Sequence, residues 1–195
     1  MKRMTLTARL QAYLDHPDSL AATVNLIAVM VGANGPFYPL YAMALIGRPG
    51  AWLFITMAAS PVFLAIPALA RRNGLAGRIA LPLFGTLNTL WCAMLIGPAS
   101  GVELLLLPCI VIAALSLRAE ERLWRWGLIG LPMAAHLALS PVYGAGLLGF
   151  SPAQEAALFR LDLGSTATLL AFLGLVYGRP VSYTHLRAHE TVLDL

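Results

Sequence analysis

The feature that most constrains this sequence is a series of long stretches without a charged residue. The first of them, residues 20–46, is 27 residues long and uncharged throughout. A helix of about 20 apolar residues can cross a bilayer, so this stretch is long enough to span with some tilt. Only 11% of the residues are charged, against about 25% in soluble domains, and the mean hydropathy is +0.76. The composition excludes a soluble enzyme of this size and predicts an all-α polytopic membrane protein.

Six such stretches predict six transmembrane helices, which fill most of residues 20–179. Their expected ranges are 20–46, 51–70, 79–97, 102–117, 127–149 and 161–177. The run from Asn34 to Pro39 contains Gly35 and Pro36, and therefore predicts a kink in the outer half of the first span. Six crossings use roughly 120 residues, which leaves no room for a folded soluble domain.

Residues 1–19 precede the first span and predict a cytoplasmic amphipathic lead. Leu6, Leu10 and Leu14 recur at helical spacing, with Arg9 on another face, as in a short helix that lies at a membrane surface. The polar residues 15–19 should end this helix and cap the next one.

Basic residues predict the orientation in the membrane. Ten Lys or Arg residues fall at the N-terminus and in alternate loops on one side, whereas the other side has only Arg48 and Arg160. Because cytoplasmic loops carry the excess of positive charge, we expect a cytoplasmic N-terminus in a multi-pass protein of the inner (plasma) membrane.

The final segment differs sharply in composition from the rest of the chain. Its sequence from residue 181, VSYTHLRAHET, resembles a translation of the transposase mosaic end and adapter used in DNA library preparation. We therefore interpret residues 180–195 as a non-native, adapter-derived tail and take Arg179 as the last native residue. His185 and His189, although spaced like zinc ligands on a helix, accordingly predict no metal site.

Polar residues inside spans are the candidate functional residues, because they need partners in a hydrocarbon environment. Asn88 and His136 both fall near the middle of the bilayer in their predicted spans, where a hydrogen bond between them is possible. His136 is a candidate proton sensor or ligand contact, since its ordinary pKa lies near physiological pH. The alternative is a neutral histidine paired only for packing.

Two acidic residues, Glu103 and Asp162, fall near the outer ends of spans. They are candidates for an outward-facing ligand or cation site, or else they cap helices that begin there. Cys92 and Cys109 lie in adjacent spans, where buried free thiols are expected, although a bridge between them stays open. The basic loop 118–122 is expected to be a solvated connection with local ion pairs.

No catalytic residue can be assigned from the motifs present. The sequence has no P-loop, no HExxH and no Ser, His and Asp set in a credible frame. We expect no cofactor, no metal and no nucleic-acid partner, and whether the whole protein is an enzyme stays uncertain. The lipid bilayer is the predicted partner.

The segment 101–126, GVELLLLPCIVIAALSLRAEERLWRW, resembles a pattern in the N-terminal six-helix membrane regions of bacterial sensor histidine kinases and related nucleotide cyclases. The matching positions are Gly101, Leu106, Leu107, Pro108, Glu121 and Arg122. The resemblance implies a membrane-embedded sensory and anchoring module, with a cytoplasmic effector domain after Arg179 and a homodimer formed through that region. The histidine box and the catalytic residues of such effectors have no counterpart in this sequence.

Two other functions stay open. The chain could be the N-terminal fragment of a small-solute transporter, in which His136 and the proline-rich spans line a path. A membrane-embedded enzyme is a weaker alternative, because paired acidic or metal-ligating residues are absent from the spans.

Overall fold

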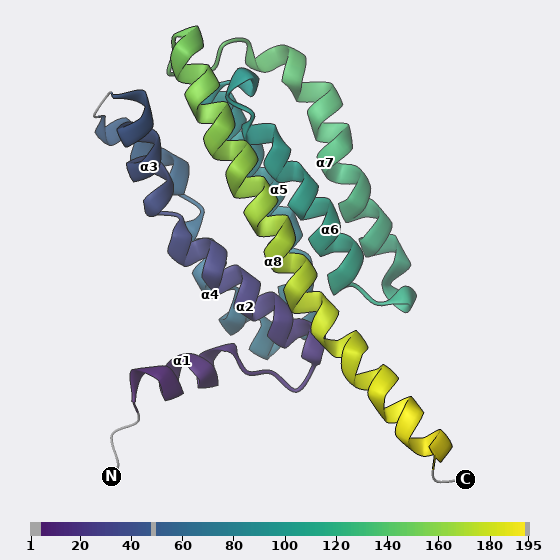
Figure 1. Cartoon of the computed structure of the whole chain (residues 1–195). Coiled ribbons are helices and arrows are strands. Elements are labelled where there is room, and N and C mark those ends of the chain that lie inside the picture. Colours follow the sequence, from purple (N-terminus) through teal and green to yellow (C-terminus); the bar gives the residue numbers. More distant parts are fainter. Residues whose placement is uncertain (1–4, 48–49, 194–195) are drawn as a thin grey trace.

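The computed structural model describes the backbone of residues 5–47 and 50–193, and the side chains of residues 5–47 and 50–178. Every regular element in those ranges is helical, as the sequence predicts, and Figure 1 shows their arrangement. The elements are α1 (Leu6–Leu14), α2 (Ser19–Asn34), α3 (Phe37–Ile46), η1 (Ala51–Met57), α4 (Ser60–Arg72), α5 (Gly74–Ile96), η2 (Pro98–Ser100), η3 (Val102–Leu105), α6 (Leu106–Ser116), η4 (Ala119–Glu121), α7 (Arg122–Tyr143) and α8 (Pro152–Leu193).

The predicted kink in the first span is confirmed. Helices α2 and α3 meet at a bend of 42°. Pro36 lies at the joint and has no N–H to donate to the carbonyl of Gly32, which interrupts the helical hydrogen bonding. Gly35 also packs directly on Ser60 of α4, where a Cβ at residue 35 would lie 1.8 Å from the serine Oγ.

Three helical segments are long and apolar enough to cross a membrane. They are Ala51–Arg72, Gly74–Ile96 and Pro152–Gly178, and the bent pair α2 and α3 makes a fourth if it counts as one span. These segments correspond to the predicted spans 20–46, 51–70, 79–97 and 161–177. Length and composition therefore support three crossings, or four with the bent pair, where the sequence predicts six.

The two remaining predicted spans differ from expectation. The stretch 102–117 consists of the four-residue 3₁₀ helix η3 followed by the 11-residue α6. Together they reach about 24 Å against a hydrocarbon core of ~30 Å, so this stretch can cross only where the bilayer is locally thinned. Helix α7 begins at Arg122 and ends at Tyr143, whereas the prediction was 127–149. Gly144, with a positive φ of 57°, follows its end, so the apolar residues after it form a loop.

Helices α2, α4, α5 and α6 form the packed interior, and α8 lies along them (Figure 1). Near the α1 end of the bundle the core contains Ile27, Phe63 and Leu81, with Leu173 contributed by α8. A second core at the opposite end joins Leu53 and Ile96 with other apolar residues. Helix α7 lies at the edge of the bundle, where only Leu128 and Pro132 of its residues are buried.

The loop between α7 and α8 closes the end of α5. The N–H groups of Leu147 and Leu148 donate to the carbonyls of Met94 and Leu95, at 3.0 and 2.9 Å. These carbonyls belong to the last turn of α5, where carbonyl groups have no hydrogen-bond partner within the helix. The loop reaches them because Gly146 adopts a φ of +78° and its backbone lies against that of α5.

The predicted N-terminal helix is confirmed as α1. Thr5 caps it by accepting a hydrogen bond from the N–H of Ala8. The helix docks on α4, because the Tyr13 hydroxyl donates to the carbonyl of Leu64 at 2.7 Å and Arg71 donates to the carbonyl of Ala12 at 2.7 Å. Leu6 remains 83% exposed.

Two sequence predictions concern residues that the structure does not describe in full. Arg48, one of the two basic residues expected on the outer side, lies outside the described residues. Helix α8 runs on to Leu193, but the side chains of the predicted adapter-derived tail, 180–195, lie outside those described, so that interpretation stays a prediction.

Candidate functional site

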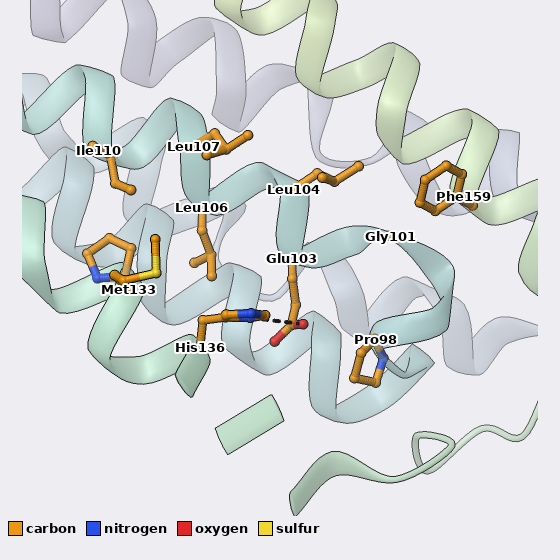
Figure 2. Close-up of a pocket in the computed structure, with 11 residues that line it drawn as sticks. Pro98, Gly101, Glu103, Leu104, Leu106, Leu107, Ile110, Met133, His136 and Phe159 are labelled. Carbon is orange, nitrogen blue, oxygen red and sulfur yellow. Dashed lines mark ion pairs between the residues drawn. The ribbon is translucent and has the colours of Figure 1, made fainter. Parts of the chain in front are cut away.

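A cavity of about 320 Å³ opens beside η3 and the first turns of α6. Figure 2 shows it between these elements, α7 and Phe159 of α8. Its walls are mostly apolar and include Leu104, Leu107 and Met133. The cavity lies at the end of the bundle opposite α1, which is the predicted outer end.

Glu103 and His136 are the two ionisable side chains that line this cavity, and they contact each other. The Nδ1 atom of His136 lies 3.2 Å from Oε2 of Glu103. The hydroxyl of Ser140, one turn further along α7, donates to the same oxygen at 3.1 Å. The other carboxylate oxygen, Oε1, is buried and has no hydrogen-bond partner among the described residues. Two residues that the sequence singled out separately thus form one polar site.

Asn88 does not join this site. Its carbonyl oxygen Oδ1 is buried in α5 and has no hydrogen-bond partner in the described part of the chain. His136 contacts Glu103 through Nδ1, and no hydrogen bond joins it to Oδ1 of Asn88 in the described structure.

Asp162 lies in a separate contact and does not line the cavity of Glu103. It is completely buried in α8 and its Oδ2 accepts a hydrogen bond from the hydroxyl of Tyr38 at 3.3 Å. Its Oδ1 has no hydrogen-bond partner within the described residues. Glu103 and Asp162 therefore do not form the single ring of acidic ligands that their positions in the sequence allowed.

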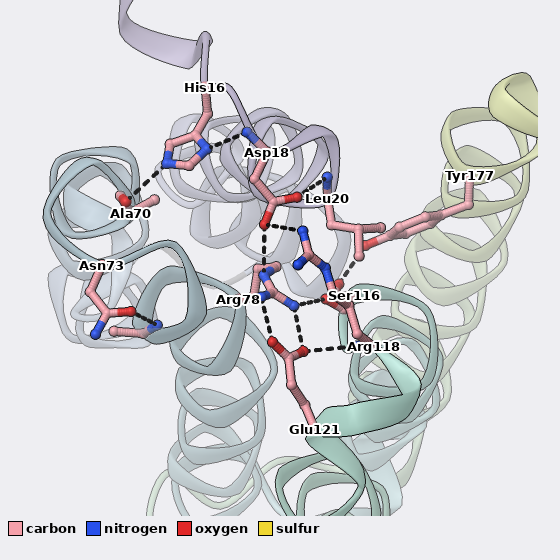
Figure 3. Close-up of polar contacts among 11 residues, drawn as sticks. His16, Asp18, Leu20, Ala70, Asn73, Arg78, Ser116, Arg118, Glu121 and Tyr177 are labelled. Carbon is pink, nitrogen blue, oxygen red and sulfur yellow. Dashed lines mark hydrogen bonds and ion pairs between the residues drawn. The ribbon is translucent and has the colours of Figure 1, made fainter.

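A second polar cluster, centred on Arg78, lies at the opposite end of the bundle (Figure 3). The guanidinium donates to both carboxylate oxygens of Glu121, each at 2.6 Å, and to the carbonyl of Ser116 at 3.1 Å. Its Nε lies 3.4 Å from Oδ2 of Asp18, and Arg118 reaches the same oxygen at 3.2 Å. We call Asp18, Arg78, Arg118 and Glu121 the Arg78 network.

Local structure positions the two carboxylates of the network. Asp18 is the N-cap of α2, and its Oδ1 accepts from the N–H of Leu20 at 3.0 Å. Glu121 ends η4 and accepts from the backbone N–H of Arg118 at 2.7 Å. Arg78 itself lies in the second turn of α5, where its side chain is 4% exposed. A buried guanidinium needs such partners because an unpaired charge there would be costly.

The network lowers the pKa of both carboxyl groups. Hydrogen bonding to Arg78 is the main cause that lowers the pKa of Glu121, and it outweighs the opposing effect of burial. For Asp18, burial raises the pKa, but the N–H of Leu20 and the charges of Arg78 and Arg118 together hold it below its ordinary value. Both groups are therefore stabilised as carboxylates.

The same cluster extends to α8. The hydroxyls of Ser116 and Tyr177 lie 2.5 Å apart, at the end of α6 and near the inner end of the apolar part of α8. Figure 3 shows Tyr177 reaching across from α8 toward the residues around Arg78. Through Ser116, a continuous set of polar contacts joins the start of α2, α5, the 118–122 loop and α8.

Sequence reasoning missed this arrangement. It placed Arg78 in a loop and treated 118–122 as a solvated connection with local pairs, which is wrong for Glu121, because that side chain binds Arg78 in another helix. The sequence did contain a signal for it. Arg78 directly precedes the apolar stretch 79–97, and two acidic residues, Asp18 and Glu121, lie close to the ends of other apolar stretches on the same predicted side.

Two further predictions concern thiols and metals. Cys92 and Cys109 are both free and buried. In the part of the chain that the structure describes, no three His, Cys, Asp or Glu residues lie together so that they could hold a metal ion.

No protein-family model, curated protein or solved structure matches this chain.

Proposed function

We propose that this chain is the membrane-embedded sensory and anchoring module of a bacterial signalling protein. The observation that carries the proposal is the polar connection between Arg78 and Tyr177 through Ser116. It links the buried guanidinium of Arg78 to the inner end of the apolar part of α8. A module that transmits a signal needs a contact of this kind between its packed interior and its output helix.

The segment Pro152–Gly178 of α8 is suited to be the output helix. It is 27 residues long and apolar enough to span a membrane, and only 17% of its most apolar 18-residue stretch is buried inside the bundle. A long helix with little buried surface can tilt or rotate against the bundle with small loss of packing. In the proposed mechanism, a stimulus near the outer end changes the packing of the bundle, and α8 passes the change to the cytoplasm. This requires two packing states that the stimulus stabilises unequally.

The proposal includes six crossings with a cytoplasmic N-terminus, in the inner membrane. Three arginines gather at the end of the bundle that carries α1. Arg71 contacts Ala12 of α1, and Arg78 and Arg118 both contact Asp18, which lies between α1 and α2. Their common location supports one basic face at that end. Reporter fusions near Ser100 and Ala119 test the topology, with an external reporter active at the first site and a cytoplasmic reporter active at the second. The reverse pattern would contradict the orientation.

An effector domain encoded after Arg179, which would dimerise with a second copy, completes the proposal. Recovery of the genomic DNA across the codon of Arg179 tests it directly. A soluble histidine kinase or cyclase domain is the expected continuation, whereas further apolar spans would contradict the sensor function. Uninterrupted genomic DNA that encodes residues 181–191 would contradict the interpretation of the tail.

The alternative is the N-terminal fragment of a small-solute transporter. Three buried polar atoms in helices of membrane-spanning length favour it, because they have no hydrogen-bond partner within the described ranges: Oδ1 of Asn88, Oδ1 of Asp162 and Oγ1 of Thr166. Polar groups of this kind mark solute pathways in many membrane proteins. Further spans in the genomic continuation would support this function in place of the sensor.

A further inference from the structure

We infer that the cavity beside Glu103 binds a lipophilic amine, with the ammonium group on the carboxylate of Glu103 and the apolar body against the walls. The inference deepens the proposed function and rests on it only for the consequence of binding, since the amine would be the stimulus. The binding itself depends only on the residues that line the cavity.

The unpartnered oxygen of Glu103 indicates what kind of group the cavity lacks. Oε2 contacts His136 and Ser140, at 3.2 and 3.1 Å, while Oε1 is buried and has no hydrogen-bond donor among the residues that the structure describes. A buried acceptor without a donor is unfavourable, and more so when it is charged. Glu103 lines the cavity, so a small turn of its carboxylate would bring Oε1 to a ligand that donates a hydrogen bond there, and this would remove the deficit.

The net charge of the Glu103 and His136 pair favours a cationic ligand. When His136 is neutral and donates from Nδ1, the ionised Glu103 leaves the site with one negative charge that no arginine or lysine offsets, since neither residue type lines the cavity. A carboxylate or phosphate ligand would be repelled, and a neutral apolar ligand would leave Oε1 without a donor. An ammonium group supplies both the donor and the compensating charge.

The walls select an apolar body for that cation. Leu107, Ile110 and Met133 line the cavity on one side, and Phe159 of α8 lies at its edge. The volume of about 320 Å³ is near the lower limit of small-molecule pockets. A compact hydrocarbon that carries one amine fits this combination, and a strongly hydrated cation does not, because the apolar walls cannot replace its water.

Contact with three elements explains how such a ligand would act. Glu103 belongs to η3, His136 to α7, and Phe159 to α8. A ligand that contacts all three would favour one relative position of α7 and α8, which is the kind of differential binding that a sensory module requires.

The test compares three probes with the same hydrocarbon cage: adamantan-1-amine, adamantan-1-ol and adamantane-1-carboxylate. The full chain in phosphatidylcholine nanodiscs is titrated by calorimetry at pH 7.4, and the signal of empty nanodiscs is subtracted. We expect the amine to bind at least tenfold more tightly than the alcohol, and the carboxylate not to bind. Equal affinity for the amine and the alcohol, or no saturable binding of the amine, would overturn the inference without any variant.

Two pairs of variants locate the site. Glu103→Gln should weaken amine binding at least tenfold, while Glu155→Gln, which removes an acidic residue near the start of α8 outside the cavity, should leave it unchanged. Met133→Trp should fill the cavity and abolish binding, whereas Leu137→Trp, on an exposed part of α7 outside the cavity, should not. Equal effects within either pair would assign the amine to another site. The genomic continuation tests the sensor function separately, so the two can fail independently.

Discussion

Arg78 and Glu121, 43 residues apart in the sequence, form a two-pronged ion pair in which both hydrogen bonds measure 2.6 Å. The arginine side chain is 4% exposed and the glutamate side chain 16% exposed. A planar guanidinium matches a carboxylate in this geometry, which makes the contact both strong and directional. The pair fixes the start of α5 relative to the loop that precedes α7.

Removal of the charge at Glu121 should destabilise the bundle. Glu121→Gln keeps the shape of the side chain, but it removes the negative charge and places an NH2 donor where one of the two acceptor oxygens of Arg78 was. We therefore expect a loss of about 2 kcal/mol in the free energy of unfolding. Unfolding by sodium dodecyl sulfate in mixed micelles measures it. Glu120→Gln, at an exposed position of the same loop, should change stability by less than about 0.5 kcal/mol. Equal losses in the two variants would show that the ion pair does not contribute.

Stability should fall in acid because of the two carboxylates of the Arg78 network. The folded-state pKa values of Asp18 and Glu121 lie below their ordinary values of 3.8 and 4.5. Their contribution is therefore complete above about pH 5 and is lost as the pH falls through the lowered values. Unfolding midpoints measured from pH 6.5 to 3 should drop below about pH 4.5, and the drop should be smaller in Asp18→Asn/Glu121→Gln. An unchanged pH profile in that double variant would contradict this origin.

Loss of the Tyr177 hydroxyl should loosen the inner end of the apolar part of α8. Tyr177→Phe removes the hydrogen bond with Ser116, and we expect a local cost of about 1 kcal/mol, equivalent to roughly fivefold faster amide hydrogen exchange around residues 170–178. Mass spectrometry of peptides from that segment measures the rate. Tyr41→Phe is the control, because the Tyr41 side chain is 53% exposed and its ring stacks on Phe37, far from Ser116 in the sequence. Unchanged exchange in Tyr177→Phe would argue against a connection between α8 and the Arg78 network.

A side chain at Gly146 should disturb the closure of α5 by the following loop. Gly146 has a φ of +78°, and an added Cβ would lie 2.4 Å from the backbone nitrogen of Gly97. Gly149 also has a positive φ, +55°, but an added Cβ there meets nothing within 4 Å. Both alanine variants should lose about 1 kcal/mol from backbone strain, and Gly146→Ala a further 1–3 kcal/mol from the clash. Thermal unfolding in detergent compares them, and equal melting temperatures would contradict the close approach.

The sequence determined the helical class, the positions of most helices and several of their ends. Long apolar stretches cannot satisfy their backbone in lipid except as helices or closed barrels, so composition alone restricts the fold. Local signals were also sufficient for the bend at Pro36 and for the cap at Asp18, because each depends on atoms within a few residues.

Only the tertiary structure decided which polar residues meet. Glu103 joins His136 and not Asp162, and Arg78 joins Glu121 across two helices, because each contact depends on how the helices rotate and pack against one another. Periodicity does not fix that rotation when a helix is apolar on all sides, as α6 nearly is. Hydropathy placed the fourth apolar stretch within one residue of its observed ends, Val102–Ser116, because it counts apolar residues, but it does not register the change from 3₁₀ to α-helix at Leu106.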